Sequence, residues 1–478
     1  MATDINHSTF LERIQLNFGH NPNKEQEMLM SCLVDFTLSD EFPACFILKG
    51  YAGTGKTSIL GAYIQSMKQF TKKTVLMAPT GRAAKVLSLK SKFTASTIHK
   101  RIYFTGTTPD GSVKLQLAPN KSKNTVFIID EASMLGELSA QQDGTISRDL
   151  LEDVFQYVYN GENCKLILLG DEGQLPPVGS ELSPALNLAY LEHHFPRVNF
   201  YVYGLSEVIR QKADSGILEN ATRIRKAQKT NIIPQIDLER FSDVKAVQGD
   251  ELIEKIDSAY ANYGTDEVIV VTRSNKRANL YNQHIRNRIL MMEEELCGGD
   301  MLMVVKNNYF WLDPLCSAGF IANGEIVKVH RVKKTETLYN VRFAHLEISL
   351  VDYPDLDRFE AIAFLDSLTS EQANLDRTFL KTLFFEIEKD YLHEKNKQKR
   401  YKEIMKSPYF NALQVKFAYA ITCHKSQGGQ WEVVFVDHGY LEEEQINNSF
   451  LRWLYTAFTR AAKQLYTVNL LEKIVQKK

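Results

Sequence analysis

Residues 50–57, which read Gly-Tyr-Ala-Gly-Thr-Gly-Lys-Thr, constrain the fold more than any other stretch of this chain. An apolar run at 44–48 precedes them, and a helix-compatible run at 58–67 follows. A strand, a glycine-rich loop and a helix in this order form the context of a phosphate-binding P-loop. The glycines let the backbone turn tightly and aim its N–H groups at phosphate oxygens, and the helix N-terminus adds a favourable dipole. We therefore expect an α/β nucleotide-binding domain.

The residue types in this loop indicate ATP and Mg²⁺ as cofactors. Lys56 is expected to meet the β and γ phosphates, and the hydroxyl of Thr57 is expected to hold Mg²⁺. The nucleotide contacts expected in the loop and in the first turn of the helix are Gly53, Thr54, Gly55, Lys56, Thr57 and Ser58.

Acidic and amide side chains follow two further apolar runs. The run at 126–129 ends in Asp130 and Glu131, the acidic partners that a P-loop requires. We expect Asp130 to hold Mg²⁺ through water, and Glu131 to orient and deprotonate the attacking water. A later run leads into a loop with Gln174 and Pro176 at the carboxyl end of a strand, the edge where parallel α/β sheets bind ligands.

Several other polar residues allow two interpretations each. Gln26 lies on a capped helix, where its amide can pair with the exchangeable edge of adenine or remain solvated. Thr80 and Arg82 follow a predicted strand, and a hydroxyl beside N–H groups at a helix start can hold a phosphate. Thr97 and His99 offer similar chemistry. Taken alone, these are ordinary strand-to-helix loops, and a lone histidine is usually structural.

Length, cysteine usage and charge narrow the class of protein. A chain of 478 residues is expected to form two or three domains. Its six cysteines are scattered without close pairs, so neither a disulfide framework nor a zinc site is expected. The start of the chain lacks the regions of a signal peptide and no apolar run approaches bilayer length, so we expect a cytoplasmic protein without a membrane partner. With a formal net charge of −1, any polyanion must be held by local basic groups in a cleft.

Taken in order, these segments resemble the superfamily 1 helicases, in the branch of the phage Dda helicase, Pif1 and RecD2. The resemblance covers residues 26–210 and 268–463. Each motif is individually weak, but six or more in the family's order are highly specific. The matching segments are 78–85 (motif Ia), 97–100 (Ib), 130–133 (II), 170–177 (III), 205–211 (IV), 418–429 (V) and 454–461 (VI).

The resemblance assigns roles in the second half of the chain. Arg210 in motif IV is implied to reach the γ-phosphate across a cleft, and Arg460 in motif VI is a planar, permanently charged donor suited to the transferring phosphoryl group. For Arg460 the alternative is a structural arginine. In motif V, the residues suited to backbone phosphates are Thr422, His424 and Lys425, and Gly428 is suited to the nucleotide.

The implied fold class is α/β, with two RecA-like P-loop domains, ATP in the cleft between them and single-stranded DNA across their tops. We expect the first domain at 1–99 and 125–204, and the second at 205–326 and 412–478. A hairpin insertion at 100–124 and an SH3-like β insertion at 327–411 with a helical arm complete the chain. The arm is rich in charge over 371–406, which indicates either a DNA contact or a solvated helix.

The hairpin expectation rests on two short β-compatible runs, 101–105 and 112–117, with a Pro-Asp-Gly turn signal between them. Members of the resembled family carry a pin at this place, where the duplex splits. Tyr103 or Phe104 could stack there on an unpaired base. The alternative is a hairpin that only packs on its own domain.

The expected function is an ATP-dependent DNA helicase that moves on single-stranded DNA, with 5′-to-3′ polarity implied by the resemblance alone. The expected partners are single-stranded DNA and its junctions with duplex, and possible protein partners are single-strand-binding, replication or repair proteins; we expect a monomer. One alternative is a translocase that does not separate strands. Another is a protein-remodelling ATPase of the AAA type, against which the arginines of the second half argue, because a ring enzyme takes its arginine finger from a neighbouring subunit.

Overall fold

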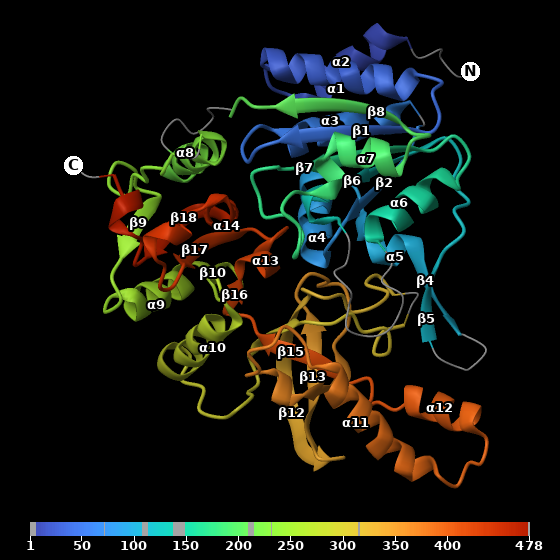
Figure 1. Cartoon of the computed structure of the whole chain (residues 1–478), viewed down its shortest axis with the longest axis vertical. Coiled ribbons are helices and arrows are strands. Elements are labelled where there is room, and N and C mark those ends of the chain that lie inside the picture. Colours follow the sequence, from blue (N-terminus) through green and yellow to red (C-terminus); the bar gives the residue numbers. More distant parts are fainter. Residues whose placement is uncertain are drawn as a thin grey trace.

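A computed structural model of the chain describes residues 6–70, 72–107, 113–136, 149–208, 215–230, 232–313 and 316–476, with the backbone alone described at 105–107, 113–115 and 377. Two parallel sheets, a closed barrel and a hairpin make up its β structure (Figure 1). This architecture confirms the predicted fold class.

The first sheet has six strands, and every pairing in it is parallel. Its residues in β6 and β7 are all buried, as expected for parallel strands that are covered on both faces. The P-loop leaves β1 at the carboxyl edge, between β7 and β8. In their order across the sheet the strands are β3 (Ala95–Thr97), β2 (Lys73–Ala78), β6 (Thr125–Ile129), β7 (Lys165–Gly170), β1 (Ala44–Gly50) and β8 (Asn199–Leu205).

Helices cover both faces of the first sheet. Alternate residues of β1 show this, because Phe46 packs with one group of helices and Ile47 with the other. The group on the Phe46 side is α1 (His7–Phe18), α2 (Lys24–Leu38), α3 (Lys56–Gln69) and α4 (Gly81–Ser91). The group on the Ile47 side is α5 (Ile98–Ile102), α6 (Leu150–Tyr159) and α7 (Leu188–His194).

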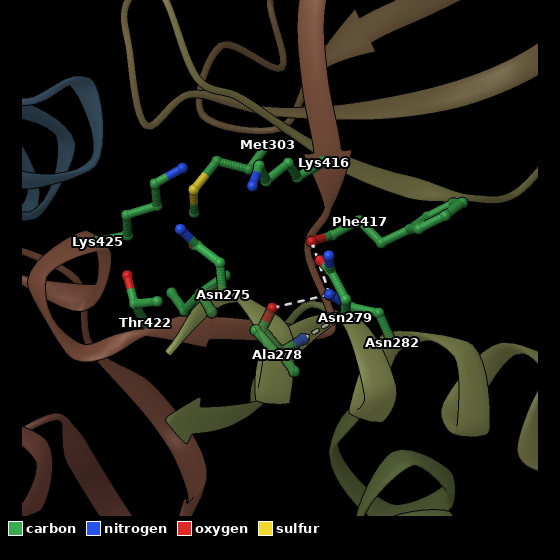
Figure 2. Close-up of a pocket in the computed structure, with 11 residues that line it drawn as sticks. Asn275, Ala278, Asn279, Asn282, Met303, Lys416, Phe417, Thr422 and Lys425 are labelled. Atoms are coloured by element: carbon green, nitrogen blue, oxygen red, sulfur yellow. Dashed lines mark hydrogen bonds between the residues drawn. The ribbon is translucent and has the colours of Figure 1, made fainter. Parts of the chain in front are cut away.

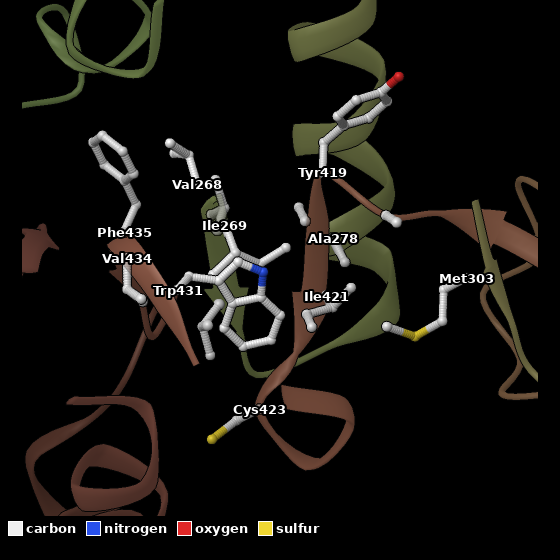
Figure 3. Close-up of a cluster of buried hydrophobic side chains, with 14 of the residues drawn as sticks. Val268, Ile269, Ala278, Met303, Tyr419, Ile421, Cys423, Trp431, Val434 and Phe435 are labelled. Carbon is white, nitrogen blue, oxygen red and sulfur yellow. The ribbon is translucent and has the colours of Figure 1, made fainter. Parts of the chain in front are cut away.

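The second sheet is also parallel throughout and has five strands. Figure 3 shows part of its core, where Trp431 lies among apolar side chains such as Ile269 and Ile421. Its strands, in order, are β16 (Ala420–Thr422), β10 (Val268–Thr272), β17 (Trp431–Asp437), β18 (Ala461–Val468) and β9 (Val244–Val247). The helices of this half are α8 (Gly216–Thr230), α9 (Leu252–Tyr263), α10 (Asn275–His284), α13 (Cys423–Ser426) and α14 (Asn448–Phe458).

A closed barrel and two helices lie beside the second sheet (Figure 1). The helices α11 (Arg377–Glu388) and α12 (Lys397–Met405) pack on the barrel through Leu383 and Ile404, while lysines of α12 remain exposed. The expected charged helix at 371–406 is therefore two helices with an apolar contact face. The barrel strands are β11 (Met301–Val304), β12 (Ile326–Leu338), β13 (Val341–Leu350), β14 (Phe359–Phe364) and β15 (Leu413–Phe417).

The barrel extends beyond the segment expected for the insertion, 327–411. Strand β11 and strand β15 pair with each other, and both lie in the ranges expected for the second RecA-like domain. Both are short and fully buried, but β11 is an unbroken apolar run whereas β15 reads Leu-Gln-Val-Lys-Phe. Neither pattern indicates which sheet the strand joins.

The hairpin consists of β4 (Tyr103–Thr107) and β5 (Val113–Leu117), which pair antiparallel. Its expected Pro-Asp-Gly turn lies outside the described residues. Within the described part of the chain, no helix is long and apolar enough to cross a bilayer.

Candidate ATP site and DNA track

The P-loop has the backbone that a phosphate cradle requires. Gly53 and Gly55 have φ values of 80° and 86°, in the left-handed region that favours glycine. A Cβ at Gly53 would also lie 3.1 Å from the side chains of Val208 and Leu218. Helix α3 begins at Lys56 without a side-chain cap, so its first N–H groups remain available to an anion.

The Lys56 ammonium folds back on the loop in this structure. Its Nζ donates to the carbonyl oxygens of Gly50 at 2.5 Å and Tyr51 at 2.9 Å. The Thr54 hydroxyl is buried and donates to the Tyr51 carbonyl at 2.9 Å. Thr57 and Ser58 lie in the first turn of α3, as expected. Two carbonyl oxygens of the P-loop thus hold the lysine in place.

Gln26 is buried with 2% of its surface exposed, so the solvated interpretation is wrong. Its Oε1 accepts from the Asn23 backbone N–H at 3.1 Å, which closes a capping box at the start of α2. Its Nε2 donates to the Thr54 carbonyl at 3.2 Å. The amide therefore joins α2 to the P-loop, and adenine recognition by Gln26 stays a prediction.

The acidic pair follows β6 at the carboxyl edge of the sheet. The Glu131 N–H donates to Asp130 Oδ1 at 2.8 Å, and Glu131 has a φ of 53°. Burial raises the pKa of both carboxyl groups, while the Lys56 ammonium acts on both in the opposite direction. Arg460 also stabilises the charged form of Glu131. A carboxylate whose pKa is raised is a stronger base toward water.

The Mg²⁺ expectation depends on Asp130 and Thr57. A carboxylate and a hydroxyl are the hard oxygen donors that this ion prefers, and protein sites usually complete its shell with waters and phosphate oxygens. Among the described residues, no group of three or more His, Cys, Asp or Glu side chains is placed to hold a metal ion. The residues present therefore fit an ion that arrives with a nucleotide.

Arg460, from the second half of the chain, lies near the P-loop and the acidic pair. It follows α14 and is 4% exposed. Its guanidinium donates to the carbonyls of Thr456 at 3.0 Å and Gly429 at 3.1 Å. These bonds hold the side chain within electrostatic reach of Glu131. Arg210, expected to act beside it, lies outside the described residues.

The loop after β7 is hydrogen-bonded to side chains from the second half of the chain. Gln174 is 6% exposed, and its Oε1 has no hydrogen-bond partner in the described part of the chain. Next to it, the Leu175 N–H donates to Thr456 Oγ1 at 2.8 Å, and Gln427 donates to the Leu175 carbonyl at 2.6 Å. Pro176 is buried. A buried amide oxygen without a partner is suited to accept a hydrogen bond from a water.

The first-half candidates for DNA contact lie at two helix starts. Thr80 caps α4 and Thr97 caps α5, each with its Oγ1 accepting a backbone N–H at 3.2 Å. Each hydroxyl keeps its own proton to donate to a phosphate. Burial lowers the pKa of His99 to about 4, so this imidazole is neutral and offers no positive charge. Arg82 stacks on Trp431, 4.2 Å from the ring centroid, in a contact between the halves.

Thr422 and Lys425 line a small pocket with residues of α10 (Figure 2). Figure 2 shows Lys425, Thr422 and Asn275 pointing toward one open space. The Lys425 Nζ is buried without a hydrogen-bond partner among the described residues. Burial, together with the charge of Lys416, lowers the pKa of Lys425 to about 7. The pocket also contains apolar side chains, and the amides of Asn279 and Asn282 already donate to backbone carbonyls. A lysine without a partner beside the Thr422 hydroxyl is nevertheless suited to a phosphate oxygen.

The other motif V candidates lie near this pocket and at the contact between the halves. His424 is exposed. Gly428 has a φ of 73°, and a Cβ there would lie 2.8 Å from Ala83 and 3.2 Å from Thr80. Gly428 thus packs against the start of α4 so closely that no side chain fits at position 428.

The two aromatic candidates of the hairpin have different surroundings. The Tyr103 hydroxyl donates to Asp153 Oδ2 at 2.6 Å, and its ring lies 5.6 Å from that of His99. Phe104 is instead 45% exposed. Of the two, Phe104 is the side chain that a nucleic-acid base can reach.

Several residues of these sites were not among the sequence-derived candidates. Lys416 belongs to the pocket in Figure 2, and Asp171, Arg452, Tyr455 and Thr456 belong to the contact around the loop after β7. The last four lie in or beside motifs III and VI, so the sequence marks their segments. Their hydrogen bonds could not be predicted, because each joins segments distant in the sequence.

Comparisons with known proteins cover both sheets. A family model described as an AAA domain matches residues 35–247, and one described as a UvrD-like helicase C-terminal domain matches residues 417–468. The ATP-dependent DNA helicase dda of Enterobacteria phage T4 is 26% identical, over 64% of this chain and 69% of that protein. The ATP-dependent RecD2 DNA helicase of Deinococcus radiodurans is 23% identical, over 88% of this chain and 46% of that protein. A solved structure of Pif1 helicases at forked duplex DNA covers 96% of this chain and 95% of its own, with 16% identity and a TM-score of 0.49.

Proposed function

We propose that this chain, a superfamily 1B helicase of the Dda, Pif1 and RecD2 type, uses ATP hydrolysis to move along single-stranded DNA and to separate duplex strands. The observation that carries the proposal is the meeting of Lys56, Asp130 and Glu131 from one half with Arg460 from the other. Hydrolysis at such a site depends on how the halves are placed. A cleft that closes on ATP and opens after hydrolysis can therefore drive movement.

Each charged group has a role in hydrolysis. Lys56 leaves the carbonyl oxygens of Gly50 and Tyr51 and meets the β and γ phosphates. Glu131 takes the proton of the attacking water, and Gln174 holds that water through its unpaired oxygen. Arg460 neutralises the charge that develops on the transferring phosphoryl group. Thr57 and Asp130 would hold Mg²⁺, which would add positive charge at the phosphates.

The proposed DNA track crosses both halves of the chain, on the side of each sheet where the strands end. The starts of α4 and α5 supply Thr80 and Thr97, and the pocket in Figure 2 supplies Thr422 and Lys425. Hydroxyls, helix N–H groups and a lysine bind phosphates without reading bases. Movement then follows when the two groups alternate their grip as the cleft opens and closes.

We further propose a cytoplasmic monomer that acts on single-stranded DNA and on its junctions with duplex. Both halves of the nucleotide site belong to one chain, so a second copy is not required to supply Arg460. All six cysteines are free, which fits a reducing compartment. The 5′-to-3′ direction of movement is part of the same proposal and follows from the family alone.

The test is ATP-dependent release of a labelled strand from a duplex with a single-stranded tail, with an excess of unlabelled trap strand. ADP in place of ATP is the control. Strand release with ATP but not with ADP supports helicase activity. DNA-stimulated hydrolysis without release would replace it with a translocase, and hydrolysis indifferent to DNA would favour a protein-remodelling ATPase.

A further inference from the structure

One buried hydroxyl joins three parts of the nucleotide site. Tyr455 lies on α14 and is 1% exposed. Its hydroxyl oxygen accepts from the Ala52 backbone N–H of the P-loop at 2.9 Å. The same hydroxyl donates to Asp171 Oδ2, in the loop after β7, at 2.7 Å. A side chain of the second half therefore bridges two loops of the first half.

The surroundings of this hydroxyl leave little freedom. Burial, followed by the charge of Asp171, raises the pKa of Tyr455 well above its ordinary value, so the phenol keeps its proton and donates. The second carboxylate oxygen of Asp171 accepts from the Gly173 N–H at 2.9 Å. A Cβ at Gly173 would lie 3.1 Å from the Tyr455 ring. The ring and the hydroxyl of Tyr455 are therefore held in one position by close contacts on both.

Tyr455 shares a rigid element with the proposed arginine finger. It lies on α14, and Arg460 follows the end of that helix. Thr456, the next residue, accepts the Leu175 N–H beside Gln174. A shift of Tyr455 relative to the P-loop consequently displaces Arg460 and the loop that carries Gln174 together.

The Ala52 N–H belongs to the P-loop, whose N–H groups are expected to bind phosphate oxygens, and it donates to Tyr455 instead. We propose that Tyr455 is a positioning residue whose hydroxyl gives up the Ala52 N–H to the nucleotide, keeps Asp171, and so couples occupancy of the P-loop to the closure that brings Arg460 into place. This inference rests on the proposed function. If the proposed function holds, the Tyr455 hydroxyl couples nucleotide binding to DNA binding.

The experiment compares Tyr455→Phe with a control, Tyr159→Phe. The Tyr159 hydroxyl also joins two elements, because it donates from the end of α6 to the Ala44 carbonyl at the start of β1 at 3.0 Å, at the opposite end of that strand from the P-loop. Two quantities are measured for each chain. One is the factor by which a non-hydrolysable ATP analogue changes the affinity for single-stranded DNA; the other is kcat and KM for ATP with saturating DNA.

In the wild type and in Tyr159→Phe, we expect the analogue to change DNA affinity by the same factor, and DNA to change analogue affinity reciprocally. In Tyr455→Phe, that factor should fall to within about twofold of one, with kcat about tenfold lower and KM within about threefold of the wild type. An unchanged factor in Tyr455→Phe, or equal losses in both variants, would overturn the inference. A wild type whose hydrolysis ignores DNA would overturn the proposed function, and the inference with it.

Discussion

At the scale of single residues, the nucleotide site depends on charges that are buried before any ligand binds. Asp130 and Glu131 lie side by side, and the cations that offset them come from both halves of the chain. Glycine conformations and the P-loop lysine could be read from the sequence, because backbone geometry and phosphate chemistry restrict both to a few residue types. The partners of Gln26, Tyr103 and Arg82 could not, because each depends on segments distant in the sequence.

Replacing the P-loop lysine tests the nucleotide site at this scale. Lys56→Ala should reduce DNA-stimulated ATP hydrolysis roughly 10²-fold or more, because a preorganised donor at the phosphates is lost. Affinity for single-stranded DNA without nucleotide should stay near that of the wild type. Lys68→Ala, at the exposed end of the same helix, is the control and should hydrolyse ATP normally. Substantial turnover by Lys56→Ala would remove the P-loop assignment.

The pocket lysine makes DNA binding depend on pH. Because the pKa of free Lys425 is lowered to about 7, the side chain is largely neutral at pH 8.5, and a bound phosphate favours its ammonium form. Affinity for single-stranded DNA should therefore fall as pH rises, by roughly three- to tenfold between pH 7 and pH 8.5. The pKa of His424 is lowered, so that imidazole is already neutral over this range.

The measurement is fluorescence anisotropy of a labelled single strand at several pH values. Lys425→Met should weaken binding at pH 7 and flatten the pH dependence, while Lys416 remains to account for any residual slope. Lys463→Met removes an exposed lysine that pairs with Glu432 and should leave the slope unchanged. A full slope in Lys425→Met would show that another group binds the phosphate.

At the scale of elements, the long parallel strands and their following helices were predictable, because continuous apolar runs of strand length alternate with helical patterns. The barrel limits were not, since β11 and β15 are short runs whose partners are set by closure of the barrel. The hairpin was predictable from its alternation. Its surroundings were not, because Tyr103 packs on the first domain while Phe104 faces outward.

The hairpin is the element that can separate strand opening from movement. Replacing 104–116 with a short Gly-Ser linker keeps Tyr103 and Leu117, which pair at the hairpin base and pack on the core. This variant should hydrolyse ATP on single strands at nearly the wild-type rate and lose most duplex unwinding, because no wedge meets the junction. Unwinding is measured by strand release and hydrolysis by phosphate release.

Phe104→Ala refines this result, because stacking of a base on an aromatic ring contributes roughly 1–3 kcal/mol. It should slow unwinding more than hydrolysis, whereas Phe385→Ala, at a comparably exposed position on α11, should affect neither. Equal loss of both activities in the linker variant would indicate a hairpin with a structural role only. Full unwinding would place strand separation on another element.

At the scale of the whole molecule, the two sheets face one nucleotide site, and the DNA candidates lie on elements of both halves. Contacts between the halves concentrate at the loop after β7 and at the start of α4, where Gly428 meets Thr80. The proposed nucleotide and DNA sites therefore share one interface. A change at either site is expected to reach the other through the relative placement of the halves.

We propose that ATP hydrolysis drives this molecule along one strand in one direction. The most direct measurement compares unwinding of two duplexes that are identical except for a single-stranded tail at the 5′ or the 3′ end of the loading strand. With ATP and trap strand present, we expect rapid release from the 5′-tailed duplex and little from the 3′-tailed one. Release from the 3′-tailed duplex alone would contradict it.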